Sequence, residues 1–373
     1  MTTDQAFKPF WEAISRRGAL GLCGAGIASS LSNPAFASSK IQAGYLPVAS
    51  STPVYFPPAN PWAGTDLEVE PLRLQAGPAI AQAIQSGSIP VGEIACTVAL
   101  SFASRGIPII PIAAVNGITR KFPYNRIMVP KDSRLRNITD LKGKTVGVLG
   151  IGTIDHLELL VALYVAKMDR NDVNVVTIPV PNQPQVLASG QVDAMMMPPP
   201  ADSVAEVQFG ARTLVDATES LPYIPLEYLV ADARWAEENP KLVRQLLVGW
   251  LKACRWIEAN KTAARASAQK VLNLAPDIAA KIRLPYWGAN GLPIMSGVWN
   301  LYFAMTETKL IEPVSDPDAM MQKYFITPTT KYTLPALNEL GRIPDLESGS
   351  LGHLKLPYLK KNAEDYSAPW EKA

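Results

Sequence analysis

Residues 145–168 read TVGVLGIGTIDHLELLVALYVAKM, and this stretch decides the fold class. The apolar run at 145–149 predicts a strand, the glycines at 150–153 predict a tight turn, and residues 154–168 carry apolar side chains at helical spacing. A strand followed at once by an amphipathic helix is the repeating unit of proteins in which helices cover a mostly parallel sheet. The stretch therefore predicts α/β architecture.

The same alternation continues on both sides of this unit. Further strands are predicted at residues 41–46, 67–74, 89–94, 107–115, 127–130, 173–178, 192–197, 212–215 and 228–231. Further helices are predicted at residues 79–86, 97–104, 138–142, 183–188, 201–209, 241–259, 262–272, 278–282 and 297–308. Residues 333–373 are rich in Pro, Gly and charge, which favours a segment that is loose or wraps the surface.

Length and charge limit the classes of protein that this chain can belong to. With 373 residues it is long enough for two domains that each bury a core. Its 35 basic and 33 acidic residues are interspersed, giving a formal net charge of +2. A nucleic-acid-binding surface concentrates Lys and Arg into a patch, and no such run occurs in the sequence, so we expect no nucleic-acid partner.

The N-terminal residues predict an export signal rather than part of the fold. Two arginines at positions 16–17 precede an apolar run at 19–31, and Ala-Phe-Ala at 35–37 forms a small-x-small cleavage site. Paired arginines before a mildly apolar core are typical of twin-arginine signals. We expect cleavage after Ala37 and a periplasmic location. The alternative is a soluble N-terminal helix with a chance arginine pair.

The cysteines and histidines indicate neither a metal site nor a catalytic centre. Cys254 lies on the apolar stripe of the predicted helix 241–259, so a buried thiol is the preferred interpretation. A disulfide with Cys96 stays open, because the periplasm permits one. The only histidines in the sequence, His156 and His353, belong to no Cys/His cluster, so no metal is expected.

Three longer runs resemble a known family. These are LKGKTVGVLGIGT at residues 141–153, PVPNQPQVLASGQVDAMMM at 179–197, and ENPKLVRQLLVGWLKACRWIEAN at 238–260. In order and spacing they are similar to the periplasmic solute-binding proteins of nitrate/sulfonate/taurine-type ABC importers. The resemblance spans roughly residues 44–325 and is strongest over 140–259.

The resemblance implies a two-lobed fold of the type II periplasmic-binding-protein class, each lobe a mostly parallel sheet flanked by helices. Residues 38–126 and 232–332 would form lobe 1, residues 127–231 lobe 2, and 333–373 a C-terminal extension. The chain would cross between lobes near 127–130 and return near 228–231. The ligand would sit in the interlobe cleft, and closure would present it to a membrane permease. A monomer is expected.

Three junctions between strand and helix are the candidate ligand-binding segments, because ligands bind beyond the carboxyl ends of parallel strands. Their candidate residues are Ser50, Ser51 and Thr52; Gly77 and Pro78; and Gly152, Thr153 and His156. Ordinary turn chemistry is the competing interpretation of each junction. His156 is either a ligand contact or a residue that caps its helix or faces solvent. An aspartate in place of Gly152 is expected to obstruct the cleft. No cofactor is expected, because Gly150-x-Gly152 lacks the third glycine of a dinucleotide fingerprint.

Four further candidate residues bear on the choice of ligand. Many relatives carry an aromatic–Glu–Pro–aromatic segment where this chain has three prolines around Pro199. Tyr223 precedes the returning hinge, and Cys96 follows the third predicted strand. Glu93 lies at the end of that strand; facing the cleft, it would repel a bare anion and favour an amine or hydroxyl. The competing interpretation of Glu93 is a solvent-facing or ion-paired side chain.

These observations favour a transport receptor over two alternatives. The receptor would bind a small polar organic molecule or an oxyanion. An enzyme on the same fold, related to pyrimidine-forming proteins, would need reactive His and Cys residues, which are sparse in this sequence. No Gly-x-Ser-x-Gly elbow is present. A ligand-sensing protein is the third possibility, and the sequence contains no separate domain for output beyond the two lobes.

Overall fold

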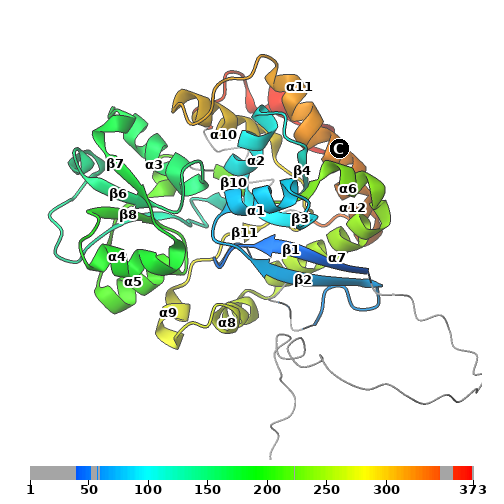
Figure 1. The fold of residues 1–373 in the computed structure, drawn as a ribbon, viewed down its shortest axis with the longest axis horizontal. Helices are drawn as coiled ribbons and strands as arrows, with labels where there is room; N and C mark the ends of the chain where they lie inside the picture. Colours follow the sequence, from blue (N-terminus) through cyan, green and yellow to red (C-terminus); the bar gives the residue numbers. More distant parts are fainter. Residues whose placement is uncertain (1–38, 52–56, 58, 222, 345–355, 372–373) are drawn as a thin grey trace, which may run out of the picture. The chain divides into compact units, whose positions relative to one another are not determined.

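The computed structural model describes residues 39–51, 57, 59–221, 223–344 and 356–371. Two sheets organise this part of the chain (Figure 1), one of six strands and one of five. We call the six-stranded sheet with its helices lobe 1 and the five-stranded sheet with its helices lobe 2. The predicted two-lobed α/β fold is confirmed, but both sheets are mixed, with parallel and antiparallel pairs, rather than mostly parallel. The predicted export signal and Thr52 lie outside the described residues.

Lobe 1 is built on a mixed sheet. In spatial order its strands are β11 (Tyr286–Trp287), β4 (Ile109–Thr119), β10 (Tyr223–Asp232), β3 (Val91–Ala95), β1 (Ser39–Tyr45) and β2 (Leu67–Arg73). The pairings β1–β2 and β1–β3 are parallel, whereas β10 runs antiparallel to β3 and to β4. Strands β4 and β10 are buried at nearly every position, which accounts for their continuous apolar sequences.

Lobe 2 repeats the pattern on a smaller scale. In spatial order its strands are β7 (Asn174–Thr177), β6 (Thr145–Val148), β8 (Ala194–Met197), β5 (Arg126–Val129) and β9 (Arg212–Asp216). The strand–turn–helix unit recognised in the sequence supplies β6 at the centre of the parallel part, which pairs with β7 and β8. Strand β5 carries the chain in from lobe 1 and is antiparallel to both of its neighbours, β8 and β9. Strand β9 forms the edge of the sheet.

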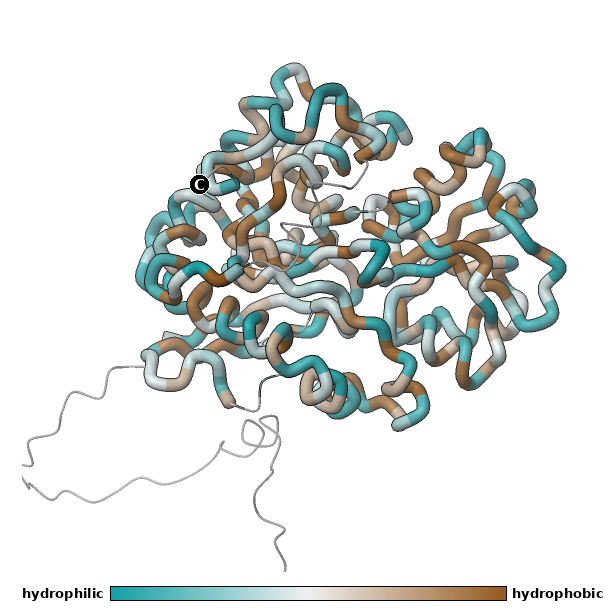
Figure 2. The backbone as a smooth tube through the Cα atoms, turned by 180° about the vertical axis from the view of Figure 1, so that it is seen from behind, coloured by the Kyte–Doolittle hydropathy of each residue, from teal (hydrophilic) through white to brown (hydrophobic). Residues whose placement is uncertain are grey.

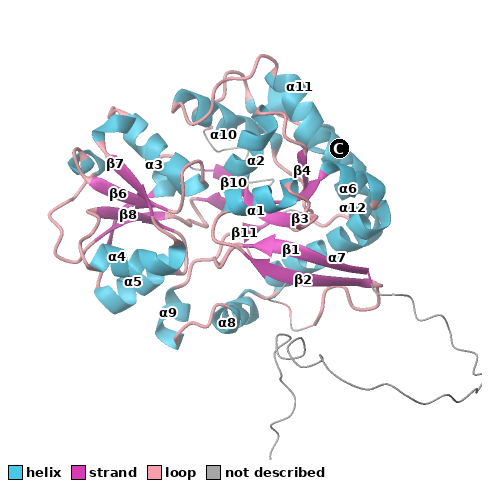
Figure 3. Ribbon diagram, in the orientation of Figure 1, coloured by secondary structure: helices cyan, strands magenta, loops and turns pink. Residues whose placement is uncertain are grey.

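Helices cover both sheets (Figure 3), and hydrophobic stretches follow the strands while hydrophilic ones follow the outer loops (Figure 2). Lobe 2 carries α3 (Ile154–Val165), α4 (Gln183–Ala188) and α5 (Ala201–Phe209). The other helices are α1 (Gly77–Gln85), α2 (Cys96–Ser104), α6 (Ala233–Glu238), α7 (Pro240–Ala259), α8 (Lys261–Val271), α9 (Pro276–Lys281), α10 (Met295–Glu307), α11 (Pro317–Met321) and α12 (Leu334–Leu340). No helix in the described ranges is long and apolar enough to cross a membrane.

The chain returns to lobe 1 earlier than the sequence predicts. From Tyr223 onward, β10 pairs with strands of the first sheet, so the expected limit of lobe 2 at residue 231 lies too far along the chain. Pro225 explains the error, because a proline inside an apolar run normally argues against a strand. A shift of register between Pro225 and Glu227 accommodates the proline here.

A segment after α8 reaches across to lobe 2. Helix α9 lies against α5 (Figure 1), and the Ser203 hydroxyl donates to the Lys281 carbonyl at 3.3 Å. Arg283 donates to the Tyr124 carbonyl, to the Asp202 carboxylate at 2.8 Å, and to Asp216 at 3.4 Å. The two lobes are therefore held by side-chain contacts as well as by the chain crossings.

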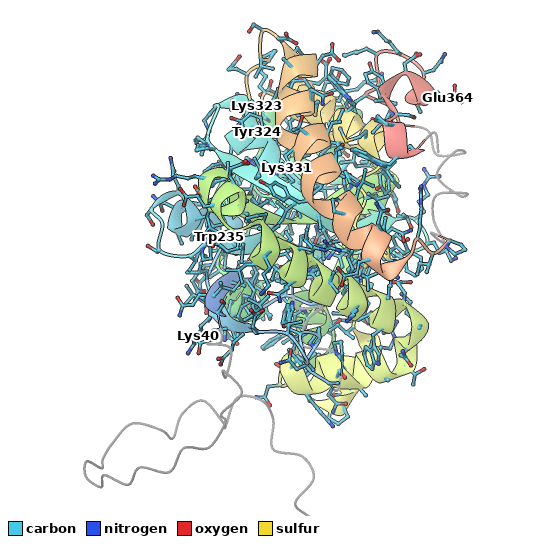
Figure 4. All side chains as sticks on the ribbon, turned by 90° about the vertical axis from the view of Figure 1, so that its right-hand side faces the viewer. Lys40, Trp235, Lys323, Tyr324, Lys331 and Glu364 are labelled. Carbon is cyan, nitrogen blue, oxygen red and sulfur yellow. The ribbon has the colours of Figure 1, made fainter. Side chains whose placement is uncertain are left out.

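The C-terminal extension packs onto lobe 1, so a loose segment is the wrong expectation for its described part. The indole of Trp370 is buried, and its Nε1 donates to the Pro293 carbonyl at 3.0 Å. The Tyr358 amide donates to Asn300 Oδ1 at 3.0 Å. Glu364, labelled in Figure 4, lies on the exposed outer turn of this segment. Two aromatic anchors thus fix a sequence that is polar between them.

Candidate functional site

A cleft of about 40 Å³ lies where residues that follow strands of the two sheets meet. Its position beyond the carboxyl ends of β1, β3, β6 and β8 is where parallel sheets place their ligands. Lobe 1 contributes Leu46, Val48, Ser50, Gly77, Ala95, Val98, Leu226 and Glu227. Lobe 2 and the crossing contribute Tyr124, Asn125, Leu149, Thr153, Ile154, Asp155 and Pro198. This volume is far below the 300–1,000 Å³ of typical ligand pockets, so the cleft is in a closed form.

Hydrogen bonds between the lobes close the cleft. The Ala49 amide donates to the Pro199 carbonyl at 3.1 Å. The Ser50 amide donates to the Tyr124 hydroxyl at 2.9 Å, and that hydroxyl donates to the Pro199 carbonyl at 3.5 Å. Two backbone segments, one after β1 and one after β8, are thereby joined directly and through one tyrosine.

The lobe 1 wall carries a buried carboxyl at Glu227. The Ser51 hydroxyl donates to its Oε1 at 2.6 Å, and Asn116 Nδ2 donates to its Oε2 at 2.9 Å. Asn116 Nδ2 also reaches the Ser50 carbonyl at 3.1 Å. Burial raises the pKa of Glu227, and the hydrogen bonds from Ser51 and Asn116 oppose that shift.

Glu93 lies behind Glu227 and is not among the residues that line the cleft, and neither competing interpretation of this residue holds. Its side chain is fully buried rather than solvent-facing, and within the described residues no cation pairs with it. Residues 93 and 229 are opposite each other in the β3–β10 ladder, which puts Glu93 and Glu227 on one face of the sheet. Burial, together with the neighbouring Glu227 carboxyl, raises the pKa of Glu93 well above its ordinary value. Glu93 therefore holds its proton to a higher pH than an exposed glutamate does.

The lobe 2 wall carries Asp155 at the start of α3. Its Oδ2 accepts from the Leu149 amide at 2.5 Å, and its Oδ1 accepts from the Thr153 hydroxyl. The amides of Asp155 itself and of His156 also hydrogen-bond to this carboxyl. Burial raises the pKa of Asp155 to about 6 despite these donors. The side chain thus occupies the position at a helix N-terminus where an external anion would otherwise bind.

A second buried acid supports the same wall. Asn125, which lines the cleft, donates through Nδ2 to Glu158 Oε2 at 2.5 Å. Asn125 Oδ1 and Glu158 Oε1 are buried and accept no hydrogen bond from the described residues. Burial raises the pKa of Glu158 well above its ordinary value. Unpaired acceptors thus lie in and beside the cleft.

His156 and Gly152 form a local turn outside the cleft. The Gly152 amide donates to His156 Nδ1 at 3.1 Å, and burial lowers the pKa of His156 to about 4, so the neutral ring binds the turn that precedes its helix. Gly152 has a φ of +84°, and a Cβ placed there meets nothing within 4 Å. Gly152 is not among the residues that line the cleft, and the expectation that a side chain at this position obstructs the cleft stays a prediction.

The other predicted residues lie at different distances from the cleft. Ser50, Gly77 and Thr153 line it, and Ser51 lies one layer behind through its bond to Glu227. Pro78, Cys96 and Pro199 are chain neighbours of lining residues. Tyr223 instead packs its ring over Gly297, in the core between β10 and α10. Cys96 and Cys254 are both free and buried, so the disulfide alternative is wrong.

Sequence reasoning missed the residues that give the cleft its character, namely Tyr124, Asn125, Asp155, Leu226 and Glu227. Tyr124 and Asn125 belong to the crossing between lobes, and a crossing necessarily borders the cleft, so its position could have identified them. Within the described ranges, no three His, Cys, Asp or Glu side chains gather as a metal-binding group.

A family model, that of the NMT1-like family, matches residues 37–273. Two curated relatives are each 27% identical to the chain. One, from Brachyspira hyodysenteriae, carries the name of an ABC transporter periplasmic binding protein and matches over 162 residues, 43% of this chain and 42% of its own length. The other, from Escherichia coli strain K12, carries the name of an aliphatic sulfonates-binding protein and matches over 207 residues, 55% of this chain and 63% of its own length. The matched segments thus span about half the length of these relatives.

Solved structures share the fold at lower identity. The alkanesulfonate-binding protein SsuA of Xanthomonas axonopodis pv. citri, bound to MOPS, superposes with a TM-score of 0.61 at 21% identity over 80% of this chain and 97% of its own. The nitrate-binding protein NrtA of Synechocystis PCC 6803 gives 0.67 at 14% identity over 81% and 89%. The desulfurization enzyme DSZB gives 0.57 at 15% over 81% and 99%. At these identities the likeness establishes the fold alone.

Proposed function

The chain belongs to the NMT1-like family, and from that membership we propose that it is the solute-binding receptor of an ABC importer. The observation that carries the proposal is the closed cleft, whose walls come from both lobes and whose lining is mostly apolar with a few polar groups. Such a cleft suits the capture of one small molecule by lobe closure. The ligand class in this proposal is a small polar organic molecule or an oxyanion.

Export and delivery complete the proposal. A receptor of this kind meets its ligand in the periplasm and hands it to a membrane permease, which agrees with the twin-arginine signal proposed for residues 1–37. N-terminal sequencing of the protein from a periplasmic extract tests this part. A mature chain beginning at Ser38 supports it, and an intact Met1 in that extract contradicts cleavage.

Ligand-dependent stabilisation tests the receptor role. A molecule that binds only the folded protein at one hundred times its Kd stabilises it by about 2.7 kcal/mol, which a thermal melt detects. The screen contains sulfonates, nitrate, taurine-like zwitterions, aromatic acids, amines and pyrimidines. The receptor proposal is supported if compounds of a single class raise the melting temperature and the protein leaves them chemically unchanged.

An enzyme is the second candidate, because DSZB shares the fold. The cleft gives it little support: the described residues that line it include no cysteine or histidine, and the buried Cys96 thiol beside it has a raised pKa. Mass spectrometry of each stabilising compound after incubation separates the two functions. Conversion of the compound into a product contradicts the receptor proposal, and recovery of the intact compound supports it.

A further inference from the structure

We propose that the cleft selects a compact organic cation or N–H donor, such as an amine, amidine or guanidine head on a small apolar body, and discriminates against bare oxyanions. This inference rests on the proposed receptor function and names the ligand class of the same cleft. Three properties of the lining carry it: the sign of its charged groups, its surplus of hydrogen-bond acceptors, and the prior occupation of a helix N-terminus that would otherwise hold an anion.

The first property is charge. Among the described residues that line the cleft, Asp155 and Glu227 are acidic and none is Lys, Arg or His. Residues 52–56, which the structure does not describe, also contain no basic residue in the sequence. Two arginines near the crossing are already paired: Arg126 with Asp202 and Glu206, and Arg283 with Asp202, Asp216 and the Tyr124 carbonyl. An oxyanion would therefore meet acidic groups on both walls without a cationic partner, whereas a cation would find a partner on each.

The second property is an imbalance between donors and acceptors. Asn125 lines the cleft with 1% of its surface exposed, and its Oδ1 lacks a donor in the described structure. Asn116 Oδ1, behind Glu227, and Glu158 Oε1, behind Asn125, are also buried without a donor. The two amide oxygens, those of Asn125 and Asn116, can only accept hydrogen bonds. Buried polar atoms are normally paired, so this surplus calls for a guest that brings N–H groups.

The third property concerns backbone donors. Oxyanions are commonly held by unpaired N–H groups at helix N-termini. At α3 the Asp155 carboxylate already takes the amides of Leu149 and His156 along with its own. At α1, Pro78 removes one N–H beside Gly77, and the next amide, that of Ala79, donates to the Ala76 carbonyl. The N-termini of α3 and α1 are therefore poor sites for an anion.

The remaining walls define the body of the ligand. Leu46, Val48, Val98, Leu149, Ile154 and Leu226 form them. These side chains favour an apolar group with few atoms, because the closed cleft holds only about 40 Å³. A suitable ligand places a charged or N–H-bearing head against Glu227 or Asp155 and a short hydrocarbon part against these apolar side chains. Such a ligand matches both the polar and the apolar parts of the lining.

Matched probes of opposite charge test the proposal on the full-length protein. Benzamidine and benzenesulfonate share a ring, and acetamidine and methanesulfonate share a methyl group, so each pair differs mainly in its head group. Thermal melts and calorimetry with these four compounds and nitrate measure the preference. We expect the amidines to bind at least tenfold more tightly than the matched sulfonates. Tighter binding of the sulfonates or nitrate would overturn the ligand class while leaving the receptor function intact.

Two variants locate the effect. Glu227→Gln preserves the shape of the side chain but removes its charge. The new amide can still hydrogen-bond Asn116 if the Asn116 side-chain amide rotates by 180°, because Asn116 Oδ1 lacks a donor in the described structure. We expect this variant to bind amidines tenfold more weakly. Asp155→Asn provides an independent measurement should the first variant fold poorly. Glu238→Gln, at an exposed carboxylate on α6, is the control and should bind like the parent. Equal affinity in all three variants would overturn the proposal.

A native mass spectrum of the purified protein covers the case in which neither probe series binds. A co-purifying small cation or N–H donor would then support the ligand class, and a co-purifying oxyanion would overturn it. If no compound binds in any screen and none co-purifies, the receptor function itself fails. The failure of the ligand class and the failure of the function are therefore distinguished.

Discussion

The backbone amide of Ala49 in lobe 1 donates a hydrogen bond of 3.1 Å to the carbonyl oxygen of Pro199 in lobe 2. Beside it, the hydroxyl of Tyr124 accepts from the Ser50 amide and donates to the same carbonyl. The buried hydroxyl of Tyr124 thus hydrogen-bonds to both lobes across the closed cleft. Two of the residues that join the lobes, Ser50 and Tyr124, also line the cleft.

Tyr124→Phe is expected to destabilise the fold. The change leaves the buried Ser50 N–H without its acceptor, and an unpaired buried donor costs about 1–3 kcal/mol. Urea denaturation measures the loss. Tyr332→Phe is the matched control, because its hydroxyl bonds the exposed side chains of Glu237, at 3.4 Å, and Lys331, and it should change the midpoint little. Equal midpoints for Tyr124→Phe and the parent would contradict this role.

Asp202→Asn should be among the most damaging substitutions in lobe 2. Asp202 is fully buried, and its Oδ2 accepts from Arg126 at 2.6 Å and from Arg283 at 2.8 Å. Removing the charge leaves two guanidinium groups facing each other, and breaking a buried pair costs about 3–5 kcal/mol. Glu238→Gln, in the exposed pair with Arg234, should leave the denaturation curve unchanged. If Asp202→Asn loses as little stability as Glu238→Gln, then solvent screens the charges of Asp202, Arg126 and Arg283.

Two neighbouring residues are expected to give opposite dependences of stability on pH. His156 has a folded pKa of about 4 against an ordinary 6.5, so between these values the unfolded state binds more protons and stability falls on acidification. Asp155 has a folded pKa of about 6 against 3.8, so the folded state binds more protons there and stability rises on acidification. Each contribution is at most roughly 3 kcal/mol, since one pKa unit corresponds to about 1.4 kcal/mol.

The two contributions nearly offset each other in the parent protein, and single variants separate them. From pH 6.5 to 4, the unfolding free energy of His156→Asn should rise relative to the parent, and that of Asp155→Asn should fall relative to the parent. Urea denaturation at pH 6.5, 5.2 and 4 measures both differences. Parallel pH profiles for the two variants and the parent would show that neither group is shifted by burial.

Gly152 and Gly297 should respond to alanine for different reasons. At Gly152 the new Cβ meets open space, so the cost is the left-handed φ of +84°, about 1 kcal/mol, with ligand affinity unchanged. At Gly297 the Cβ would lie 2.2 Å from the Tyr223 ring and force it to move, costing about 1–3 kcal/mol. Denaturation and calorimetry of both variants test this. Loss of ligand binding in Gly152→Ala without loss of stability would show that this turn contacts the ligand.

Most elements of the fold could be predicted from the sequence because their side chains repeat with clear periods. Helices α4 and α5 have the predicted bounds, and β6 begins at the predicted residue. The start of β10 could not be predicted, because Pro225 breaks the local pattern and only the register shift in the ladder accommodates it. The two-residue strand β11 has no periodicity to detect.

The cleft was less predictable than the fold because its polar groups depend on pairing across distant segments. Ser50 and Thr153 could be found as turn residues after strands. Glu227 shows its role only when Ser51, 176 residues away in the chain, is placed against it. Glu93 illustrates the limit: its burial follows from the position of β10, and no local pattern distinguishes it from a surface glutamate.

The buried acids also alter the electrical character of the whole molecule. The formal charge of +2 counts every carboxyl group as ionised. Burial raises the pKa of Glu93 and of Glu158 well above the ordinary value, so each holds its proton to a higher pH in the folded protein than in the unfolded chain. Between those two pH values, unfolding releases the protons. Denaturation in that interval therefore lowers the net positive charge of the chain, which changes its migration in an electric field.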